Sequence, residues 1–292
     1  MKFTIATPSF RNSEWLKLCI ASVADQEGVT LEHIVHDACS DDGTLEWLPS
    51  DPRVRACVEK DNGMYDAVNR AWKKGDGEIV AYLNCDEQYL PGALEKVHDY
   101  FAANPDIDIA IADAIVADAE GSYLCHRVAV TPGPLSVWVR FNVLTCSLFI
   151  RRSFLEEHNL YFDTRWRDLG DAQWVVAAIR AGARFGELPV LTSIFTETGA
   201  NMNLLPNAER EKAEHYAMSP AITRALRPLF VGAHWLKAAT RPNTWLAPFE
   251  YALYRKGDAT KRVTIKAAKP TSTWVGRSPV ERLVKLLPVP GR

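Results

Sequence analysis

The chain has 292 residues, which is enough for one large domain or two small ones with a buried core. Hydrophobic residues make up 47% and charged residues 24%, a composition typical of a soluble globular protein that argues against a disordered chain. The net charge of −2 is divided unevenly: residues 1–219 carry 20 Lys and Arg against 33 Asp and Glu, whereas residues 220–292 carry 14 against 3.

The six cysteines form no CxxC pair and no His/Cys pattern with metal-binding spacing. The N-terminal apolar run is interrupted at Pro8, too early for a signal peptide. No window reaches the ~18 apolar residues that a membrane span requires. We therefore expect free thiols in a reducing, cytoplasmic environment.

The first hundred residues alternate between strand and helix patterns. Apolar runs predict four strands, at residues 2–7, 31–37, 54–60 and 78–83. Helical patterns follow them at residues 14–26, 45–48, 64–75 and 92–105, with Ser13 as the expected N-cap of the first helix. Strands separated by helices indicate βαβ units, and hence a parallel sheet with right-handed crossovers.

The rhythm changes after residue 105. Residues 106–130 are expected to form short strands with a turn at Glu120-Gly121, and residues 143–152 another strand. A helix is predicted to start between Asp168 and Asp171, ahead of an extended stretch over residues 184–198. Residues 206–240 have a largely helical pattern, and the last fifty residues are expected to be irregular or only partly helical.

Polar and acidic clusters follow each of the four N-terminal strands. They are Thr7-Pro8-Ser9, Asp37 with the turn SDDG, the stretch KDNGMYDA, and Asn84-Cys85-Asp86-Glu87. The last one directly follows five apolar residues, 79–83, which indicates a strand buried on both faces. Each cluster alone could be an ordinary loop, but parallel strands end at one side of a sheet, so we expect the four loops to meet in one site.

Acidic loops at a sheet edge raise the question of how such a site would hold a phosphate. No G-x-G-x-x-G follows the first strand and no GxxxxGK[ST] occurs in the sequence, so no glycine loop is available to cradle phosphates. Carboxylates cannot hold a phosphate unaided. A divalent cation between carboxylate and diphosphate resolves the conflict, because Mg²⁺ and Mn²⁺ prefer hard oxygen ligands.

Four stretches together resemble the family 2 glycosyltransferases, nucleotide-sugar-dependent enzymes with a GT-A fold; they are TPSFRNSEWLKLCIASVADQ, EHIVHDACSDDGT, EKDNGMYDAVNRAWKKGDGEIVAYLNCDE and YLPGAL. The similarity runs from about residue 3 to 200. It implies an α/β fold whose central sheet is Rossmann-like and mostly parallel, with helices on both faces. We expect a nucleotide-sugar-binding half at 1–104, an acceptor-binding and catalytic-base half of the same domain at 105–205, and a helical, basic C-terminal extension at 206–292.

The resemblance also implies roles for individual residues. Around the nucleotide and the donor sugar it places Thr7, Pro8, Ser9, Arg11, Asp37, Ser40, Asp42, Gly63, Met64, Tyr65, Asp66, Asn69, Asn84, Cys85 and Asp86. Asp37 would hydrogen-bond the base of the nucleotide. The family's D-x-D motif maps to Asn84-Cys85-Asp86, which makes Asp86 the expected ligand of Mn²⁺ or Mg²⁺, with UDP as the expected nucleotide.

The catalytic base of the family begins a helix in the second half of the domain, and the matching stretch GDAQWVVAAI places Asp171 in that role. Asp168, three residues earlier, is the rival candidate and is expected to be the N-cap of the helix. Trp166 and Arg167 are candidate acceptor contacts, because aromatic rings stack on sugars and Arg pairs with phosphates. A core position for Trp166 is an equal alternative.

Three positions depart from the pattern of the family. Glu87 stands where a second aspartate is common; it can still bind a metal, but with a longer arm. Thr145-Cys146 replaces a common His-Gln, and Ile111-Ala112-Asp113 replaces a common Tyr-Gly-Asp. These last two changes lie in the acceptor half, where Asp113 is a candidate substrate contact, and indicate a different acceptor and not a loss of catalysis.

The basic, Trp-bearing tail is a candidate for peripheral contact with an anionic membrane, at the inner face of the plasma membrane. A solvated face or an oligomer arm would have the same composition. Nucleic acid is disfavoured as a partner, because the body of the protein is acidic and no nucleic-acid-reading motif occurs.

The function expected from these observations is that of an inverting, metal-dependent glycosyltransferase. It would move a sugar from a nucleotide-diphosphate donor to a hydroxyl of a glycan or lipid-linked acceptor, in the synthesis of a cell-surface polysaccharide or glycoconjugate. One alternative is a nucleotidyltransferase on a similar sheet, although TPSFRNSE lacks the glycine-rich loop. The other is a non-catalytic glycan-binding module, which the retained Asp37, Asp86 and Asp171 disfavour.

Overall fold

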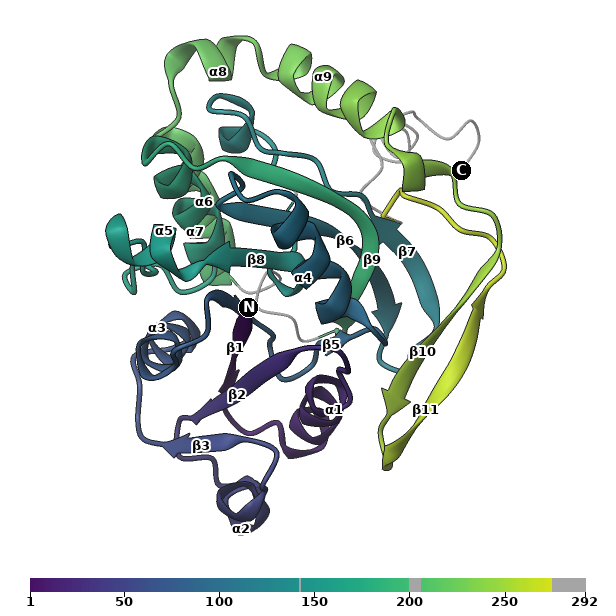
Figure 1. The fold of residues 1–292 in the computed structure, drawn as a ribbon. Coiled ribbons are helices and arrows are strands. Elements are labelled where there is room, and N and C mark those ends of the chain that lie inside the picture. Colours follow the sequence, from purple (N-terminus) through teal and green to yellow (C-terminus); the bar gives the residue numbers. More distant parts are fainter. Residues whose placement is uncertain (142, 200–205, 275–292) are drawn as a thin grey trace, which may run out of the picture.

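A computed structural model describes residues 1–141, 143–199 and 206–274. One nine-stranded sheet forms its centre, and Figure 1 shows helices packed on both faces of that sheet. The predicted α/β fold is therefore confirmed.

The strands follow the order β3 (Arg55–Val58), β2 (Thr30–Asp37), β1 (Lys2–Ser9), β4 (Ile79–Tyr82), β8 (Leu148–Arg151), β6 (Ile109–Asp118), β9 (Phe185–Glu197) and β5 (Gln88–Tyr89), with β7 (Tyr123–Arg127) paired to β6. The first four are parallel, as the βαβ pattern predicts. Strand β8 is antiparallel to both of its neighbours and joins this parallel part to the second half, where β6 and β9 are again parallel. The parallel strands β1, β2 and β4 end on the same side of the sheet.

Two layers of helices bury the sheet. On one face α1 (Ser13–Ala24) and α4 (Ala93–Ala103) pack against β1 and β4, and on the other face lie α3 (Met64–Lys74), α5 (Arg152–Glu157) and α6 (Gly170–Arg180). Helix α3 shows why the sequence folds this way: Tyr65, Val68 and Trp72 recur at helical spacing and are all buried. The indole N–H of Trp72 also donates to the carbonyl of Ala81 in β4, at 3.0 Å.

The expected N-cap of α1 is wrong. The N-cap is Asn12, and Ser13 is already helical. A carboxylate distant in sequence takes over the capping role, because Asp42 accepts a hydrogen bond of 2.9 Å from the backbone N–H of Ser13. The same carboxylate accepts from the hydroxyl of Thr44, at the start of α2 (Thr44–Trp47), so Asp42 joins two helix starts.

The C-terminal extension is only partly helical, which corrects the prediction of a helical 206–292. Helices α7 (Pro206–Ala217), α8 (Ala221–Ala225) and α9 (Arg227–Ala239) are followed by a hairpin of β10 (Phe249–Arg255) and β11 (Asp258–Ala267). Alternate side chains of the hairpin, Tyr251 and Leu253, pack against Ile115 of β6 and Ile194 of β9. This burial favours strands in a stretch for which irregular or only partly helical structure was predicted. Residues 275–292 lie outside the described part of the chain.

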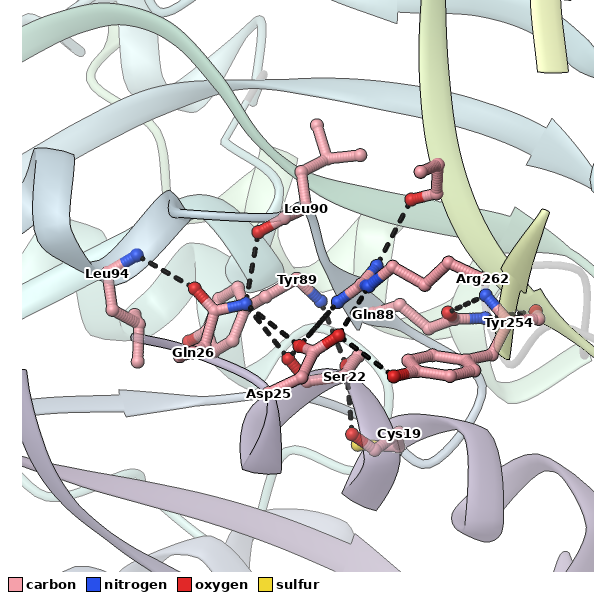
Figure 2. Close-up of polar contacts among 11 residues, drawn as sticks. Cys19, Ser22, Asp25, Gln26, Gln88, Tyr89, Leu90, Leu94, Tyr254 and Arg262 are labelled. Carbon is pink, nitrogen blue, oxygen red and sulfur yellow. Dashed lines mark hydrogen bonds and ion pairs between the residues drawn. The ribbon is translucent and has the colours of Figure 1, made fainter. Parts of the chain in front are cut away.

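Polar contacts join the hairpin to α1 and β5, as Figure 2 shows. The buried amide of Gln88 exchanges two hydrogen bonds with the backbone of Tyr254, at 2.9 and 2.8 Å. Asp25, which follows α1, accepts from the Tyr254 hydroxyl at 2.9 Å and from two nitrogens of Arg262 at 2.6 and 2.8 Å. Because β5 begins one residue after Glu87, the hairpin holds the strand that follows the acidic loop.

No helix in residues 1–141, 143–199 and 206–274 is long and apolar enough to cross a membrane.

We predict that Arg262→Gln lowers the free energy of unfolding by about 1–2 kcal/mol, because it removes a partly buried, two-pronged contact with Asp25. Urea denaturation measures the change. Arg255→Gln, an exposed change on the same hairpin, is the matched control. Equal stability of the two variants would show that the contact does not hold the hairpin.

Candidate active site

A cavity of about 1810 Å³ opens at the carboxyl ends of the parallel strands. Its walls come from residues after β1, β2 and β4, from the starts of α3 and α6, from residues 137–141 and 143–145, and from α7 and α9. Charged and aromatic side chains predominate along it; they include Arg11, Asp61, Tyr65, Asp86, Arg127, Trp138, Arg140, Arg167, Asp168, Asp171, Lys212, His215, Trp235 and Trp274. The convergence expected of the strand-end loops is thus present.

The loops after β1 and β2 are held together by the buried carboxylate of Asp37. It accepts hydrogen bonds from the hydroxyl of Ser9 at 2.9 Å, and from the backbone N–H and hydroxyl of Ser40 at 2.7 and 2.8 Å. Ser40 in turn accepts from the backbone N–H of Arg11, at 2.8 Å. Arg11 has a positive φ of 53°, which a non-glycine residue rarely adopts, so these contacts fix an uncommon backbone conformation at the cavity wall.

The acidic loop after β4 forms a tight turn. The carboxylate of Glu87 accepts from the backbone N–H of Asn84 at 2.8 Å, and the N–H of Glu87 donates to the Asn84 carbonyl at 3.0 Å. Burial and the neighbouring Asp86 raise the pKa of Glu87 to about 8. Burial raises the pKa of Asp86 to about 6, and this carboxylate lies on the cavity wall.

Residues at the start of α3 contact the start of α6. Gly63 has a φ of 109°, and its N–H donates to the carboxylate of Asp61 at 2.8 Å. The hydroxyl of Tyr65, two residues later, accepts from the backbone N–H of Asp171 at 3.1 Å. Gly170 permits this contact, because a Cβ there would lie 2.5 Å from the Tyr65 ring.

Asp171 is the acidic group that α6 contributes to the wall of the cavity. It lies in the first turn of α6, where its carboxylate accepts from the N–H of Ala172 at 2.8 Å. Burial raises its pKa to about 6, and the hydrogen bonds from Ala172 and Tyr65 offset only part of this shift. The raised pKa makes this carboxylate a better proton acceptor than an ordinary aspartate.

Asp168 is not the N-cap of α6, so that prediction is wrong. The N-cap is Leu169. The free N–H groups ahead of the helix are satisfied from α7, because Glu211 accepts from the backbone of Arg167, Asp168 and Leu169, each at 2.9 Å. The Asp168 carboxylate itself accepts from the side-chain amide of Asn207 at 2.6 Å.

The structure separates the predicted site residues into two groups. Those on the cavity wall are Pro8, Ser9, Arg11, Gly63, Met64, Tyr65, Asn84, Cys85, Asp86, Arg167, Asp168 and Asp171. Among the described residues, those expected at the site but not on its wall are Thr7, Asp37, Ser40, Asp42, Asp66, Asn69, Glu87, Asp113 and Trp166. The second group consists mainly of polar residues that hold the loops behind the wall.

Four of these off-wall residues show what such positions do. Asn69 bonds the backbone of Phe162 through both its side-chain amide atoms, at 2.8 Å each. Asp113, with 1% exposure, accepts from the backbone N–H of Ala129 and from Asn243, both at 2.6 Å. Asp66 accepts from the backbone N–H of Asn62 at 2.9 Å. Trp166 borders a separate cavity of about 510 Å³ between α6 and α7.

Some residues of the cavity were not anticipated from the sequence. The cavity is also lined, from segments distant in sequence, by Trp138, His215 and Trp235. Glu211 does not line it but accepts hydrogen bonds from the loop before α6. Nothing in the local pattern distinguishes Glu211 from the other acids of α7, whose exposed faces carry Glu209 and Glu214. Only the packing of α7 against that loop reveals its role.

The residues after β4 fit a divalent cation bound together with phosphates. Within the described part of the chain, no three His, Cys, Asp or Glu side chains gather so as to hold a metal ion by themselves. The desolvated carboxylate of Asp86 is a hard oxygen ligand on the wall, and the side-chain oxygen of Asn84 is buried without a hydrogen-bond partner among the described residues. Mg²⁺ characteristically uses one or two carboxylates plus substrate phosphates, which is the donor set available here.

The sequence of residues 4–162, more than half of the chain, matches the model of a family described as Glycosyl transferase family 2. Among curated proteins, the chain is 27% identical to the succinoglycan biosynthesis protein ExoO of Rhizobium meliloti over 197 residues, 62% of this chain and 56% of that protein. It is 32% identical to the putative teichuronic acid biosynthesis glycosyltransferase TuaG of Bacillus subtilis over 98 residues, 32% of this chain and 39% of that protein. The chain thus spans about half the length of these relatives or less.

Solved structures share the fold at low sequence identity. The fragment 1–349 of TarS from S. aureus, in complex with UDP-GlcNAc, superposes with a TM-score of 0.56 and 17% identity, over 83% of this chain and 82% of that one. The mannosyltransferase PcManGT from Pyrobaculum calidifontis, in complex with GDP-Man and Mn²⁺, gives 0.53 and 17%, over 82% and 70%. At these identities the likeness establishes the arrangement of the chain alone.

We predict that Glu211→Gln lowers the free energy of unfolding by about 2 kcal/mol, because an amide nitrogen replaces one of two oxygens that face backbone N–H groups. Urea denaturation measures the loss, and Glu214→Gln, an exposed change on the same helix, is the control. If the two variants unfold at the same urea concentration, Glu211 does not anchor the loop.

Proposed function

The chain belongs to glycosyl transferase family 2, and on this basis we propose that it transfers a sugar from a nucleotide-diphosphate donor to a hydroxyl of a glycan or lipid-linked saccharide, with inversion at the anomeric carbon. The observation that carries the proposal is the pair of carboxylates, Asp86 and Asp171, on walls of the same cavity. Asp86 lies in the loop that follows strand β4, and Asp171 lies in the first turn of α6. Asp86 would act on the diphosphate of the donor and Asp171 on the hydroxyl of the acceptor.

The nucleotide would occupy the part of the cavity formed by the loops after β1 and β2. Pro8 and Arg11 line it there, and Cys39 continues the wall after β2. Asp37, which the resemblance assigned to the base of the nucleotide, would act through Ser9 and Ser40, since its own oxygens accept three hydrogen bonds behind the wall. We propose UDP as the nucleotide.

Asp86 would hold a divalent cation, Mn²⁺ or Mg²⁺, with the diphosphate of the donor, and Asn84 would contribute its amide oxygen, which is otherwise without a hydrogen-bond partner among the described residues. When bound, such an ion supplies charge neutralisation of the leaving diphosphate. Glu87 would support this turn through its bond to the Asn84 N–H and would not itself reach the ligand, since it is 1% exposed.

Asp171 would act as the general base. The acceptor hydroxyl attacks the anomeric carbon on the face opposite the diphosphate, the bond to the diphosphate oxygen breaks, and the hydroxyl proton passes to the Asp171 carboxylate. A helix N-terminus alone would lower the pKa of Asp171, but burial outweighs this effect and raises the pKa to about 6. The group therefore stays basic enough for this step. Tyr65 and Ala172 fix the orientation of the residue.

We further propose that the product belongs to a cell-surface polysaccharide or glycoconjugate. The support is the similarity to proteins described as acting in succinoglycan and teichuronic acid biosynthesis. Trp138, Trp235 and Trp274 give the cavity the aromatic surfaces on which sugar rings stack, so they are suited to an acceptor glycan. A nucleotidyltransferase is disfavoured by the family match, and a non-catalytic module by the desolvated carboxylates at the site.

We predict that Asp171→Asn lowers the rate of sugar transfer by about 10²–10⁴-fold while leaving nucleotide affinity within a few-fold, because it keeps the shape of the residue and removes its basicity. Transfer is measured by nucleotide release, first screening donors by slow hydrolysis with Mn²⁺. Asp168→Asn is the matched control and should retain most activity, since that carboxylate contacts Asn207. Loss of transfer in a folded Asp168→Asn, with an active Asp171→Asn, would reverse the two roles.

We also predict that Asp86→Ala abolishes the Mn²⁺-dependent part of nucleotide binding without unfolding the protein. The reason is the position of this carboxylate on the wall, directly after the buried strand β4. Titration calorimetry with UDP, with and without Mn²⁺, measures it. Unchanged affinity in Mn²⁺ would contradict the assignment of Asp86 as the ligand.

A further inference from the structure

Large apolar side chains are exposed in one part of the molecule, the segment 218–245. The exposed fractions there are 53% for Met218, 55% for Ile222, 40% for Leu226, 67% for Leu229, 70% for Leu236 and 80% for Trp245. In the rest of the described chain, only Phe10, Leu45 and Val58 are large, apolar and exposed to at least 36%. A concentration of this kind is unusual on a monomeric protein and marks an interaction surface.

These residues form an apolar stripe along α8 and α9. Ile222 lies on α8 and Leu226 at the junction of the two helices. On α9, Leu229 and Leu236, with the exposed Ala233 between them, recur three or four residues apart and so share one face. The opposite face of α9 is also apolar and packs inward through partly buried Trp235 and buried Ala238. Figure 1 shows α8 and α9 running one after the other along the outer edge of the molecule.

The charged residues of the segment that carries the stripe are all basic. No Asp or Glu occurs in residues 215–249, which contain Arg224, Arg227, Lys237 and Arg241. Lys237 and Arg241 pair with the single carboxylate of Glu187, so this group keeps a positive charge, and Arg224 and Arg227 are both exposed. The body of the protein, residues 1–219, is acidic by comparison, with 20 Lys and Arg against 33 Asp and Glu.

From these observations we infer that the outer face of α8 and α9 binds the surface of an anionic bilayer. The apolar stripe would lie among the outer acyl chains, and the excess positive charge of residues 215–249 would attract the anionic headgroups. Trp245, which follows α9, has the exposure and amphipathic character of an interfacial anchor, and its indole N–H is held by the Ala239 carbonyl at 3.3 Å. Helix α9, with 13 residues, is too short to span a bilayer and would lie in its plane.

The same helix forms part of the cavity. Arg227 and Trp235 of α9 line it, and the Arg227 guanidinium lies over the ring of Tyr216, 5.6 Å from its centre, which is also on the wall. A bilayer beneath α9 would therefore lie one helix away from the cavity. The position of the bilayer next to the cavity favours an acceptor that a lipid holds in the membrane. This conclusion about the acceptor rests on the proposed function.

The structure also limits the proposed membrane-binding surface to one part of the basic tail, the outer face of α8 and α9. The hairpin β10–β11 contributes several of the basic residues of the tail, but it packs against α1, and Arg262 is paired with Asp25. Truncation after residue 240 would remove these contacts and disturb the fold. Point substitutions on α9 leave the hairpin in place and are the sharper test.

The experiment measures flotation of the full chain with vesicles of phosphatidylcholine alone or with phosphatidylglycerol, at low salt, in the absence of any donor. We expect binding to the anionic vesicles only, and a loss of about tenfold or more in partitioning for the double variant Leu229→Glu/Leu236→Glu. The double variant Leu45→Glu/Val58→Glu removes exposed apolar residues elsewhere, and we expect it to bind as the wild type does. Both variants change exposed positions, and their urea unfolding checks that they fold.

Three results would overturn the inference: no binding of the wild type to anionic vesicles, equal binding to both vesicle types, or equal partitioning of the two double variants. A wild-type dimer that Leu229→Glu/Leu236→Glu converts to a monomer, without any vesicle binding, would identify the stripe as a self-association surface instead. Because flotation needs no donor and no turnover, its outcome is independent of whether the proposed transferase activity is found.

Discussion

Strand β4 pairs in parallel with β1 from Ile79 beside Phe3 to Tyr82 beside Ala6, and the N–H of Leu83 continues the ladder to the Ala6 carbonyl at 3.0 Å. The rest of the site depends on this pairing. It forces the chain to leave the sheet beside the end of β1, so that Asp86 lies on the same wall as Pro8. All four residues of β4 are fully buried, which makes the strand a rigid support for a carboxylate in a poorly solvated position.

The second wall is built from the other half of the chain and is held in place from both sides. Tyr65 of α3 accepts from the N–H of Asp171, and Glu211 of α7 fixes the loop before α6. The C-terminal extension thus contributes to the site twice, because its hairpin also holds β5, next to the acidic turn, through Gln88 and Tyr254. The desolvation of Asp171 that raises its pKa follows from this packing, and not from any property of the residue alone.

Much of this arrangement could be predicted from local sequence. The strands and helices of the first hundred residues, the convergence of their loops, and the places of Asp86 and Asp171 on one cavity all follow from hydrophobic periodicity and family-like motifs. The errors lie where a residue distant in sequence replaces a local partner: Asp42 bonds the first N–H of α1, and Glu211 bonds the N–H groups before α6, where Ser13 and Asp168 were expected to cap. The hairpin β10–β11 was missed because Ala252 and Tyr254 stand between and after Tyr251 and Leu253, so β10 shows no clear alternation of polar and apolar residues. Asp37 and Asp113 show the remaining difficulty, since a sequence does not tell a wall residue from one hydrogen-bonded behind it.

The account claims, above all, that Asp171 is a desolvated base on the wall of the cavity. The pH dependence of sugar transfer tests this most directly, measured as kcat/KM for the acceptor at saturating donor and Mn²⁺. Because burial raises the pKa of Asp171, the carboxyl is protonated and inactive below the raised value, so activity should fall steadily as the pH drops below about 6 and level off above it. Activity that stays constant from about pH 8 to 5, or a residual activity of Asp171→Asn with the same inflection, would contradict the claim.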